Sequence, residues 1–357
     1  MKTTLFKFLR LLLIASVYWV LAFLLFIAIR YNGLEAELKI YTDEYLGLPV
    51  DAFYEFAILL GLITGMFYTI IEFTFDKLSK TLILGLSTLL KSIIYFILII
   101  IVLSSISFLI EEQIDIDLPN ERGWWKTDPF FWNTILYFIA ASTVFSLVRI
   151  ASGRFGRGNF IQILMGKYKN PKEEEHVLMF IDLKDSTKIA EKIGHQQYSG
   201  FIQDCFIDLN NTLSKFEAEV YQYVGDEAVI HWPVRKGFRK NNCINLFFAF
   251  QKRLQKKEAY YTNKYGFSPK FKAGIHYGIL MVAEVGTVKK DLAFHGDVIN
   301  TASRIQSLCN VYQKQLIVSE SVLDELRISA THYELLSEDV ELRGKNERLK
   351  IYAINQG

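Results

Sequence analysis

Cysteine and histidine are scarce in this sequence, and their positions narrow its chemistry. Only three cysteines occur in 357 residues, Cys205, Cys243 and Cys309. They are far apart and odd in number, so they predict neither a disulfide framework nor a paired metal site, and reduced structural thiols are the better interpretation. No histidine precedes His176. The first part of the chain therefore has no imidazole to ligate haem, which excludes a membrane cytochrome.

Neither sign of charge dominates, since the formal net charge is only +2. The sequence has no stripe of Lys and Arg interleaved with exposed aromatic residues, which is the footprint expected of a nucleic-acid binder. It also has no internal repeat and no low-complexity tract. We therefore expect no nucleic-acid partner.

Charge is scarce in the first part of the chain in particular. Residues 1–150 hold only 11 of the 40 Lys and Arg residues and 14 of the 38 Asp and Glu residues. The remainder has the charge density of an ordinary soluble domain, although 51% of the whole chain is hydrophobic. This imbalance predicts a membrane domain joined to a water-soluble domain, and it excludes a wholly soluble enzyme.

Long apolar runs are what the first part does contain. A bilayer core needs about 20 mainly apolar residues per helix. Four runs meet this length, Leu11–Ile29, Phe53–Phe73, Leu82–Ile110 and Phe130–Val148. The first could be a signal peptide, but it exceeds the usual apolar stretch of about 7–15 residues and no small-x-small cleavage site follows it. We predict a four-helix transmembrane domain over residues 1–150.

The loops predict the orientation of these spans. Lys and Arg cluster in the leader, in the connection after the second span and after the fourth span, whereas the other two loops are acidic. Positive residues stay cytoplasmic, so a multi-pass protein of the cell membrane with a cytoplasmic soluble domain is expected. The outer loops are too short to fold alone, since a core below roughly 40 residues is rarely self-sufficient. Membrane lipid, and a lipid-soluble or membrane-borne ligand of the helices, are therefore the expected partners of this domain.

A few unusual residues occur within or near the spans. Glu55, Glu72 and Lys91 are ionisable, and a charge inside a membrane is expensive enough to suggest a function. The alternative is that both glutamates reach the headgroups from span ends while Lys91 extends its ammonium to the interface. Gly61 and Gly65 form a small-xxx-small pair that permits close helix contact.

The soluble part begins after a connector, residues 151–175, that is rich in Gly, Lys and Arg. Pro171 and a charge cluster mark the end of this connector. From residue 176 to 357, apolar periods of 2 and 3.6 alternate in the order β-α-β-β-α-β. Strands are expected at 176–183, 219–224, 228–232, 271–279 and 280–285. This order predicts an α/β (α+β) ferredoxin-like sheet with helices on one face.

Two acidic residues have special positions in this order. Asp182 ends the first strand, and Asp226 lies at the tip of the next hairpin. In a βαββ arrangement both carboxylates can reach one point above the sheet, and carboxylates with phosphate oxygens are typical Mg²⁺ ligands. Glu227 should face the other way by strand alternation.

A helix start follows Asp182 directly, at Asp185, Ser186 and Thr187, and its free N–H groups favour an anion. Metal ligands beside such a helix start are the parts of a nucleoside-triphosphate site. Taken singly, either motif could be a plain N-cap or a plain hairpin turn.

Four strings make the resemblance specific. They are FIDLKDST (180–187), YQYVGDEAVI (221–230), AGIHYGILMVAEVG (273–286) and HGDVINTASRI (295–305). From about His176 to its end, the chain resembles the class III nucleotide cyclase catalytic domain, which includes adenylate and guanylate cyclases. The resemblance implies cyclisation of a nucleoside triphosphate, with release of pyrophosphate.

The resemblance also implies the first half of a site. The metal ligands would be Asp182, the main-chain carbonyl of Leu183, and Asp226, holding two Mg²⁺ or Mn²⁺ ions per site. The nucleotide would lie against the helix start that follows, at Leu183, Lys184, Asp185, Ser186 and Thr187. Asp185 departs from the family pattern, because a carboxylate beside the triphosphate is unexpected.

The other half of the implied site comes later in the chain. Asn300 and Arg304 match the family's transition-state pair, one helical turn apart and so on one helix face. Arg343 matches its pyrophosphate-binding residue, with Lys345 as a near alternative. In this family the metal aspartates and the Asn/Arg pair of one site come from different subunits, so the resemblance implies a homodimer and an inactive monomer.

The base-selecting positions of the family fall on Gln222 and Ala293, and neither carries the residue usual for adenine or for guanine. A glutamine amide can pair with either base. ATP is favoured by analogy with membrane-anchored bacterial adenylate cyclases. A guanylate cyclase, a cyclase for another nucleotide and a non-catalytic cyclase-like receptor or scaffold are the alternatives.

Overall fold

The chain divides into two compact units, Met1–Arg154 and Phe155–Gly357. In this computed structural model the described residues are 2–31, 50–78, 129–155, 162–163, 165–287, 290–341 and 348–355, together with 86, 90–91, 93–98, 100–101 and 126. The three cysteines lie in the second unit, and all are buried and free.

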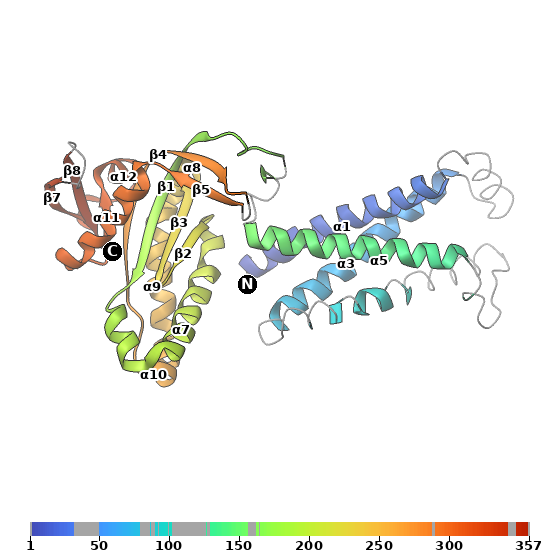
Figure 1. Ribbon diagram of the computed structural model, residues 1–357, viewed down its shortest axis with the longest axis horizontal. Helices are drawn as coiled ribbons and strands as arrows, with labels where there is room; N and C mark the ends of the chain where they lie inside the picture. Colours follow the sequence, from blue (N-terminus) through green and yellow to red (C-terminus); the bar gives the residue numbers. More distant parts are fainter. Residues whose placement is uncertain are drawn as a thin grey trace. The chain divides into compact units, whose positions relative to one another are not determined.

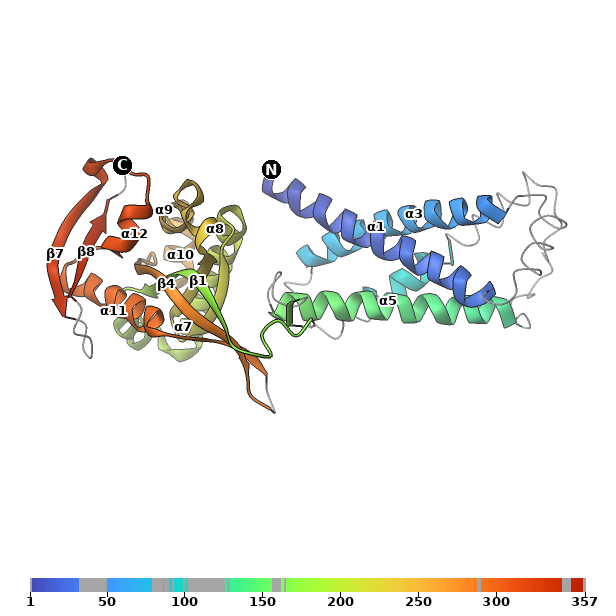
Figure 2. The same ribbon diagram turned by 90° about the horizontal axis from the view of Figure 1, so that it is seen from above.

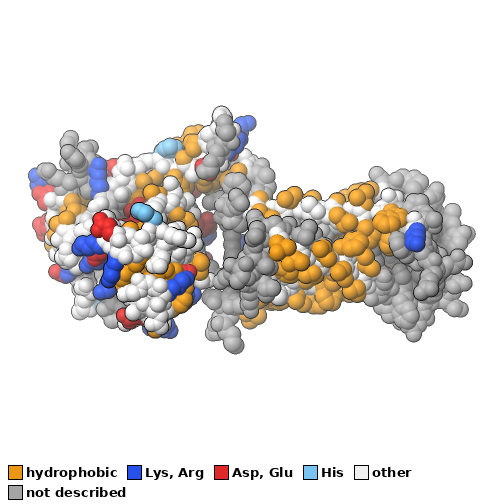
Figure 3. Space-filling model, turned by 60° about the horizontal axis from the view of Figure 1, so that its bottom comes forward, with side chains coloured by type: hydrophobic (Ala, Val, Ile, Leu, Met, Phe, Trp, Pro, Cys, Tyr) orange, Lys and Arg blue, Asp and Glu red, His pale blue; other side chains and the backbone are white. Residues whose placement is uncertain are grey.

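The first unit contains three long apolar helices among its described residues: α1 (Lys2–Tyr31), α3 (Val50–Leu78) and α5 (Pro129–Phe155). Each is long and apolar enough to cross a membrane, over Phe8–Ile29, Tyr54–Phe75 and Phe131–Ser152. They coincide with the first, second and fourth predicted spans. The third, Leu82–Ile110, lies largely outside the described residues, although 93–98 are helical. Hydrophobic side chains cover much of the described surface of this unit in the face that Figure 3 shows.

Close contact between α1 and α3 depends on two glycines. A Cβ added to Gly61 would lie 2.5 Å from Cα of Val20, and one added to Gly65 would lie 2.5 Å from Cα of Ser16. Both distances are too short for a side chain, so the helices approach at this point because these residues have none.

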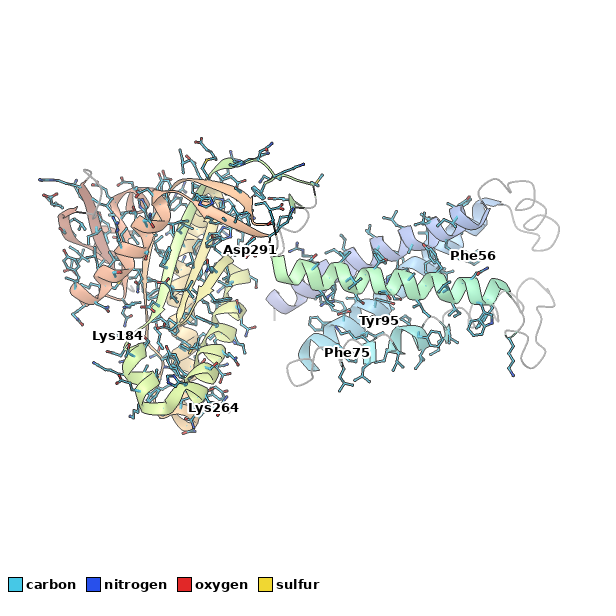
Figure 4. The ribbon with its side chains drawn as sticks, viewed as in Figure 1. Phe56, Phe75, Tyr95, Lys184, Lys264 and Asp291 are labelled. Atoms are coloured by element: carbon cyan, nitrogen blue, oxygen red, sulfur yellow. The ribbon has the colours of Figure 1, made fainter. Side chains whose placement is uncertain are left out.

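A buried charge cluster joins three helical segments of this unit. Glu72 on α3 is only 2% exposed, and its Oε2 lies 2.8 Å from Nζ of Lys91 and 2.9 Å from Nη1 of Arg149 on α5. Tyr95 donates its hydroxyl to the other carboxylate oxygen, and Figure 4 shows Tyr95 inside the helical unit. Glu72 therefore does not reach towards headgroups; it pairs with cations inside the bundle.

The second unit is built on one mixed sheet. Its strands are β1 (Lys172–Leu183), β2 (Glu219–Val224), β3 (Glu227–Pro233), β4 (Phe271–Val285), β5 (Asp291–His295), β6 (Leu316–Ser319), β7 (Tyr333–Glu341) and β8 (Arg348–Ile354). The order is β2-β3-β1-β4-β6-β8-β7, with β5 paired to β4. The first four strands reproduce the ferredoxin-like arrangement, so the predicted fold class is confirmed. The two strands expected at 271–285 are one strand, β4, whose end forms a hairpin with β5 beyond the rest of the sheet (Figures 1 and 2).

Helices cover both faces of this sheet. The helical elements are α7 (Ser186–Leu213), η3 (Ser214–Phe216), α8 (Val234–Phe238), η4 (Arg239–Asn241), α9 (Asn242–Lys256), α10 (Glu258–Tyr265), α11 (Asp297–Val311), α12 (Glu320–Glu325) and η5 (Ala330–His332). Apolar residues of α7, α9 and α10 pack with alternate residues of β1, β3 and β4 in the main core. The intervening strand residues pack against α11 on the other face. The two helices of the ferredoxin-like order, α7 and α9, therefore share one face, as the sequence predicts, and α10 lies on the same face.

Gly274 allows α11 to lie directly on β4. A Cβ at this position would collide with the main-chain nitrogen of Gln306 and lie 2.6 Å from its Cα. Because Gly274 lacks a side chain, the helix backbone rests against the strand. This contact sets the position of α11, which carries Asn300 and Arg304.

Candidate active site

Asp182 lies at the end of β1, between two neighbouring strands. It is directly opposite Glu227 of β3 and Lys272 of β4. Its Oδ2 lies 3.1 Å from Nζ of Lys272 and accepts a hydrogen bond of 3.1 Å from Nε2 of Gln306 on α11. Lys272 also donates to Oδ1 of Asn310 at 3.0 Å. The carboxylate is therefore held in place by a cation and an amide of its own chain.

Asp226 lies in the turn between β2 and β3, where Gly225 has a φ of +59° that favours glycine. The two aspartates are close. Burial raises the pKa of Asp182, the neighbouring Asp226 raises it further, and Lys272 opposes both effects. Two carboxylates from distant parts of the sequence thus meet at the end of the sheet.

Glu227 does not face away from this point, so the expectation from strand alternation was wrong. Residues directly opposite in an antiparallel pair share a face of the sheet, and Glu227 is opposite Asp182. Burial, Asp182 and Asp226 together raise the pKa of Glu227 to about 7, against the effect of Lys272. Alternation was counted from Asp226, but Asp226 belongs to the turn and not to the strand.

The start of α7 follows these carboxylates along the chain. Leu183 is buried, and the N–H of Lys184 donates to the carbonyl of Lys270 at 2.8 Å. Asp185 has a φ of +58° and makes no side-chain cap. Its exposed carboxylate pairs with Lys188 at 3.3 Å, which explains how an acid is tolerated here. The helix then begins at Ser186, and Thr187 is exposed.

Tyr198 is a member of this cluster that sequence reasoning missed. Burial and the nearby Asp226 raise its pKa to about 12, and a hydrogen bond with Ser186 lowers it. The tyrosine lies beyond a break in α7 at Gly194, whose φ is +78°. Helical spacing from Ser186 could not have placed it, because the break changes the direction of the helix.

Lys272 and Gln306 were also missed. Lys272 is 9% exposed, and it lines a small cavity of about 140 Å³ with Lys184, Lys270 and Lys314. Figure 4 shows Lys184 beside the end of the sheet where β1 finishes. The one available signal was position, since Lys272 immediately precedes the string AGIHYG. A cationic cavity next to paired carboxylates is suited to an anion that also binds metal.

Asn300 and Arg304 both lie on α11, where Asn300 is exposed and Arg304 is half-buried. Gln306, which contacts Asp182, is two residues after Arg304. Two residues correspond to about 200° around a helix. The Asn/Arg pair therefore leaves α11 on the side away from Asp182 of the same chain.

Gln222 and Ala293 lie on β2 and β5, which are not neighbours in the sheet. Their neighbours in the chain are in contact, because the rings of Tyr221 and Phe294 stack with centroids 4.3 Å apart. Gln222 is exposed and Ala293 is half-buried. Figure 4 shows Asp291, at the start of β5, at the opposite end of the unit from Lys184.

Two predicted positions cannot be placed. Arg343 and its alternative Lys345 lie outside the described residues. Within the part of the chain that the structure describes, no three His, Cys, Asp or Glu side chains form a complete metal site. Two carboxylates fit a divalent ion that takes its remaining oxygen ligands from phosphates and water, as Mg²⁺ usually does.

Comparisons with known proteins identify the family of the second unit. The family described as the adenylate and guanylate cyclase catalytic domain matches residues 168–356, more than half of the chain. Adenylate cyclase 2 of Rhizobium meliloti (strain 1021) is 29% identical over 226 residues, 63% of this chain and 62% of that protein. An adenylate cyclase of Anabaena cylindrica is 25% identical over 184 residues, 50% of this chain and 36% of that protein. The chain thus spans less than two thirds of the length of either relative.

The fold has a counterpart among solved structures. A bacterial light-regulated adenylyl cyclase aligns with a TM-score of 0.53 at 16% identity, over 66% of this chain and 67% of that chain. At this identity the likeness shows a shared fold. The family match, the order of the four strings and the observed sheet agree: the chain belongs to the adenylate and guanylate cyclase catalytic-domain family.

Proposed function

We propose that this protein is a membrane-bound adenylate cyclase that converts ATP to 3′,5′-cyclic AMP and pyrophosphate. The observation that carries the proposal is the meeting of Asp182 and Asp226 beside the start of α7. The ribose 3′-oxygen would attack the α-phosphorus, forming the ester bond as the bond to pyrophosphate breaks. The 3′-hydroxyl proton would leave to water or a nearby carboxylate.

Asp182 and Asp226 would hold the divalent ions, with the carbonyl of Leu183 as a further ligand. Bound Mg²⁺ or Mn²⁺, two per site, supplies charge neutralisation at the phosphates and a lower pKa for the 3′-hydroxyl. The N–H groups at the start of α7, from Ser186 onward, would receive the triphosphate. Lys272 would add a cation close to the same phosphates, since its ammonium already lies 3.1 Å from Asp182.

The catalytic pair would come from a second copy of the chain. Arg304 would neutralise charge that develops on the α-phosphate, and Asn300 would orient the ribose. Arg343 would hold the pyrophosphate, for which a guanidinium is well suited. The direction in which α11 presents Asn300 and Arg304, away from Asp182 of the same chain, supports a homodimer with shared sites.

ATP is favoured as substrate because the similar proteins from Rhizobium meliloti and Anabaena cylindrica are named adenylate cyclases. GTP is the second candidate, because the exposed amide of Gln222 can pair with guanine as well as adenine. Ala293 offers no side-chain hydrogen bond to either base.

The membrane unit would place the catalytic unit in the cytoplasm, with both chain ends on that side. The three apolar helices among its described residues support an anchor, and the distribution of Lys and Arg supports the orientation. A lipid-soluble or membrane-borne ligand of these helices would then regulate the dimer.

The test is direct. The purified full-length protein would be given ATP, GTP, CTP or UTP with Mg²⁺ or Mn²⁺, and cyclic nucleotide and pyrophosphate would be measured. We expect cyclic AMP from ATP, its loss on chelation with EDTA, and its loss in Asp182→Asn and Arg304→Ala. Cyclic GMP alone would establish the second candidate. No product from any nucleotide would favour a non-catalytic receptor or scaffold.

A further inference from the structure

The residues next to the two predicted base-selecting positions contact each other through a side chain. β2 and β5 share no main-chain pairing, yet Tyr221 stacks on Phe294 with an interplanar angle of 11°. The N–H of Phe294 also donates to the hydroxyl of Tyr221 at 3.2 Å. A bulge in the β2–β3 pairing between Val220 and Gln222 makes Tyr221 the extra residue, and bulges commonly re-aim a side chain.

The ring of Phe294 in this stack also contacts two buried histidines. The ring centroid of Phe294 lies 4.9 Å from that of His231 and 5.4 Å from that of His176. The two histidines join through their Nδ1 atoms at 3.1 Å, and Nε2 of His176 lies 2.9 Å from Oε2 of Glu174. The carboxylate of Glu174 can only accept a hydrogen bond, so Nε2 of His176 is the donor in that contact. If the His176 ring is neutral, its Nδ1 has no proton and accepts a hydrogen bond from Nδ1 of His231.

Glu174 links these rings to the connector turn, which we define as residues 165–170. Nζ of Lys167 lies 2.7 Å from Oε1 of Glu174, and the hydroxyl of Tyr168 donates to the same oxygen at 3.1 Å. Tyr168 is 4% exposed and belongs to the same apolar cluster as Phe294. Its carbonyl accepts a hydrogen bond of 2.9 Å from the N–H of Glu284 on β4.

The connector turn is therefore attached both to the β4–β5 hairpin and to the start of β1. It follows α5 by about ten residues, since α5 ends at Phe155. A shift of the connector turn would change the packing around Phe294, because protein interiors are packed too closely to accommodate such a movement locally. Phe294 directly follows Ala293 and Tyr221 directly precedes Gln222, so a shift of their stacked rings would move both positions.

We propose that Tyr168, Phe294 and Tyr221 form a positioning relay, through which the connector turn sets the spacing of the two base-selecting positions. The inference rests on the proposed function, because it assigns those positions to nucleoside-base binding. Tyr221, Phe294 and Lys167 are positioning residues that act through Gln222 and Ala293. Substituting these residues should change nucleotide affinity and the choice of base, and should not change the rate of the chemical step.

The experiment uses the full-length protein in lipid nanodiscs and two matched pairs of variants. Tyr221→Leu removes the stack, and Tyr223→Leu removes a neighbouring tyrosine whose hydroxyl bonds Asn210 at the surface. Lys167→Met breaks the ion pair with Glu174, and Lys169→Met removes an exposed lysine from the same turn. Tyr221→Phe is the conservative variant, which keeps the ring and loses only the hydrogen bond.

We expect Tyr221→Leu and Lys167→Met to raise KM for ATP about three- to tenfold, as loss of one aromatic pair or hydrogen bond would. Their ratio of activity with ATP to activity with GTP should change, while kcat stays within about twofold. Tyr221→Phe should lie between wild type and Tyr221→Leu. The two control variants should match wild type, and melting temperatures would show that every variant is folded.

The outcomes separate this relay from the proposed function. An active wild type whose variants change only in kcat, or behave like their controls, would overturn the relay alone. A wild type that makes no cyclic product but binds a fluorescent ATP analogue would overturn the proposed function, and the relay would then be judged by the Kd of the variants. A wild type without product or binding would overturn both.

Discussion

Gln306 donates a hydrogen bond to Asp182 at 3.1 Å, while Arg304, two residues earlier on α11, leaves the helix about 200° away. The same helix therefore supports one half of the proposed site and presents the other half on a different side. This relationship is the physical basis for expecting catalysis between two chains.

Mixing two inactive variants tests that expectation. Asp182→Ala and Arg304→Ala should each be inactive as homodimers. A mixed dimer should regain up to about half of one wild-type dimer's activity, because one of its two sites has all its residues. Cyclic product would be measured after co-expression with two different affinity tags. Purified mixed dimers that stay inactive would contradict a site shared between chains.

Gly274→Ala tests the close packing of α11 against β4. The added Cβ would collide with the backbone of Gln306, so the helix must move and carry Asn300 and Arg304 with it. We expect destabilisation by about 1–3 kcal/mol, as overpacking usually costs, and a loss of activity greater than tenfold. Thermal unfolding and product formation would measure both effects.

Gly200→Ala is the matched control, because its Cβ would meet only the hydroxyl of Tyr265 at an ordinary 3.5 Å. This variant should unfold at or above the wild-type temperature, since alanine favours a helix. Equal behaviour of the two variants would show that contact with Gly274 does not position α11.

Burial, with a smaller contribution from His176, lowers the pKa of His231 to about 3. In the unfolded chain the pKa is about 6.5. Between these values the unfolded state binds a proton that the folded state does not, so stability falls as pH drops below about 6.5. At pH 5 this effect lowers the free energy of unfolding by about 2 kcal/mol.

His231→Gln should remove this pH dependence. From pH 7.5 to pH 5 its melting temperature should fall less than that of wild type, as measured by scanning fluorimetry of the full chain. His195→Gln, at an exposed position, should keep the wild-type fall. An unchanged pH response in His231→Gln would mean that this histidine is not neutral and buried in the folded protein.

Glu72→Ala tests the charge cluster of the first, helical unit. It would leave Lys91 and Arg149, whose side chains are 18% and 26% exposed, without their shared carboxylate. Removing one partner of a buried ion pair costs about 3 kcal/mol or more, so the helices should separate at a lower detergent or denaturant concentration. Glu55→Ala, an exposed position on the same helix, should have little effect. Equal stability of both variants would contradict a structural role for Glu72.

Much of the architecture could be predicted from local patterns. Apolar runs of membrane length indicated the helices of the first unit, and the order of the four motifs indicated the family. The ferredoxin-like order followed from alternating periods, because strand and helix periodicity are properties of short segments. The positions of Asp182 and Asp226 at strand ends were visible for the same reason.

Other features depended on which segments meet. The face of Glu227 followed from its partner Asp182 across β1 and β3, not from counting along its own strand. The continuity of β4 through residue 279 follows from its pairing with β1 and then β5. Apart from the position of Lys272 immediately before a motif, no local pattern indicated that Lys272 and Gln306 contact Asp182, because their segments lie far from it in the chain.

The amino-acid sequence alone determined the apolar helices of membrane-spanning length, the cyclase motifs and the residue types of the proposed site, since hydropathy and motif spacing act over a few turns or strands. Tertiary structure decided which carboxylates share a face, which side of α11 carries Arg304, and that Tyr168 of the connector turn and Phe294 share one apolar cluster. Those relationships arise from pairing and packing between segments that are distant in the chain, and no local pattern encodes the pairing partner.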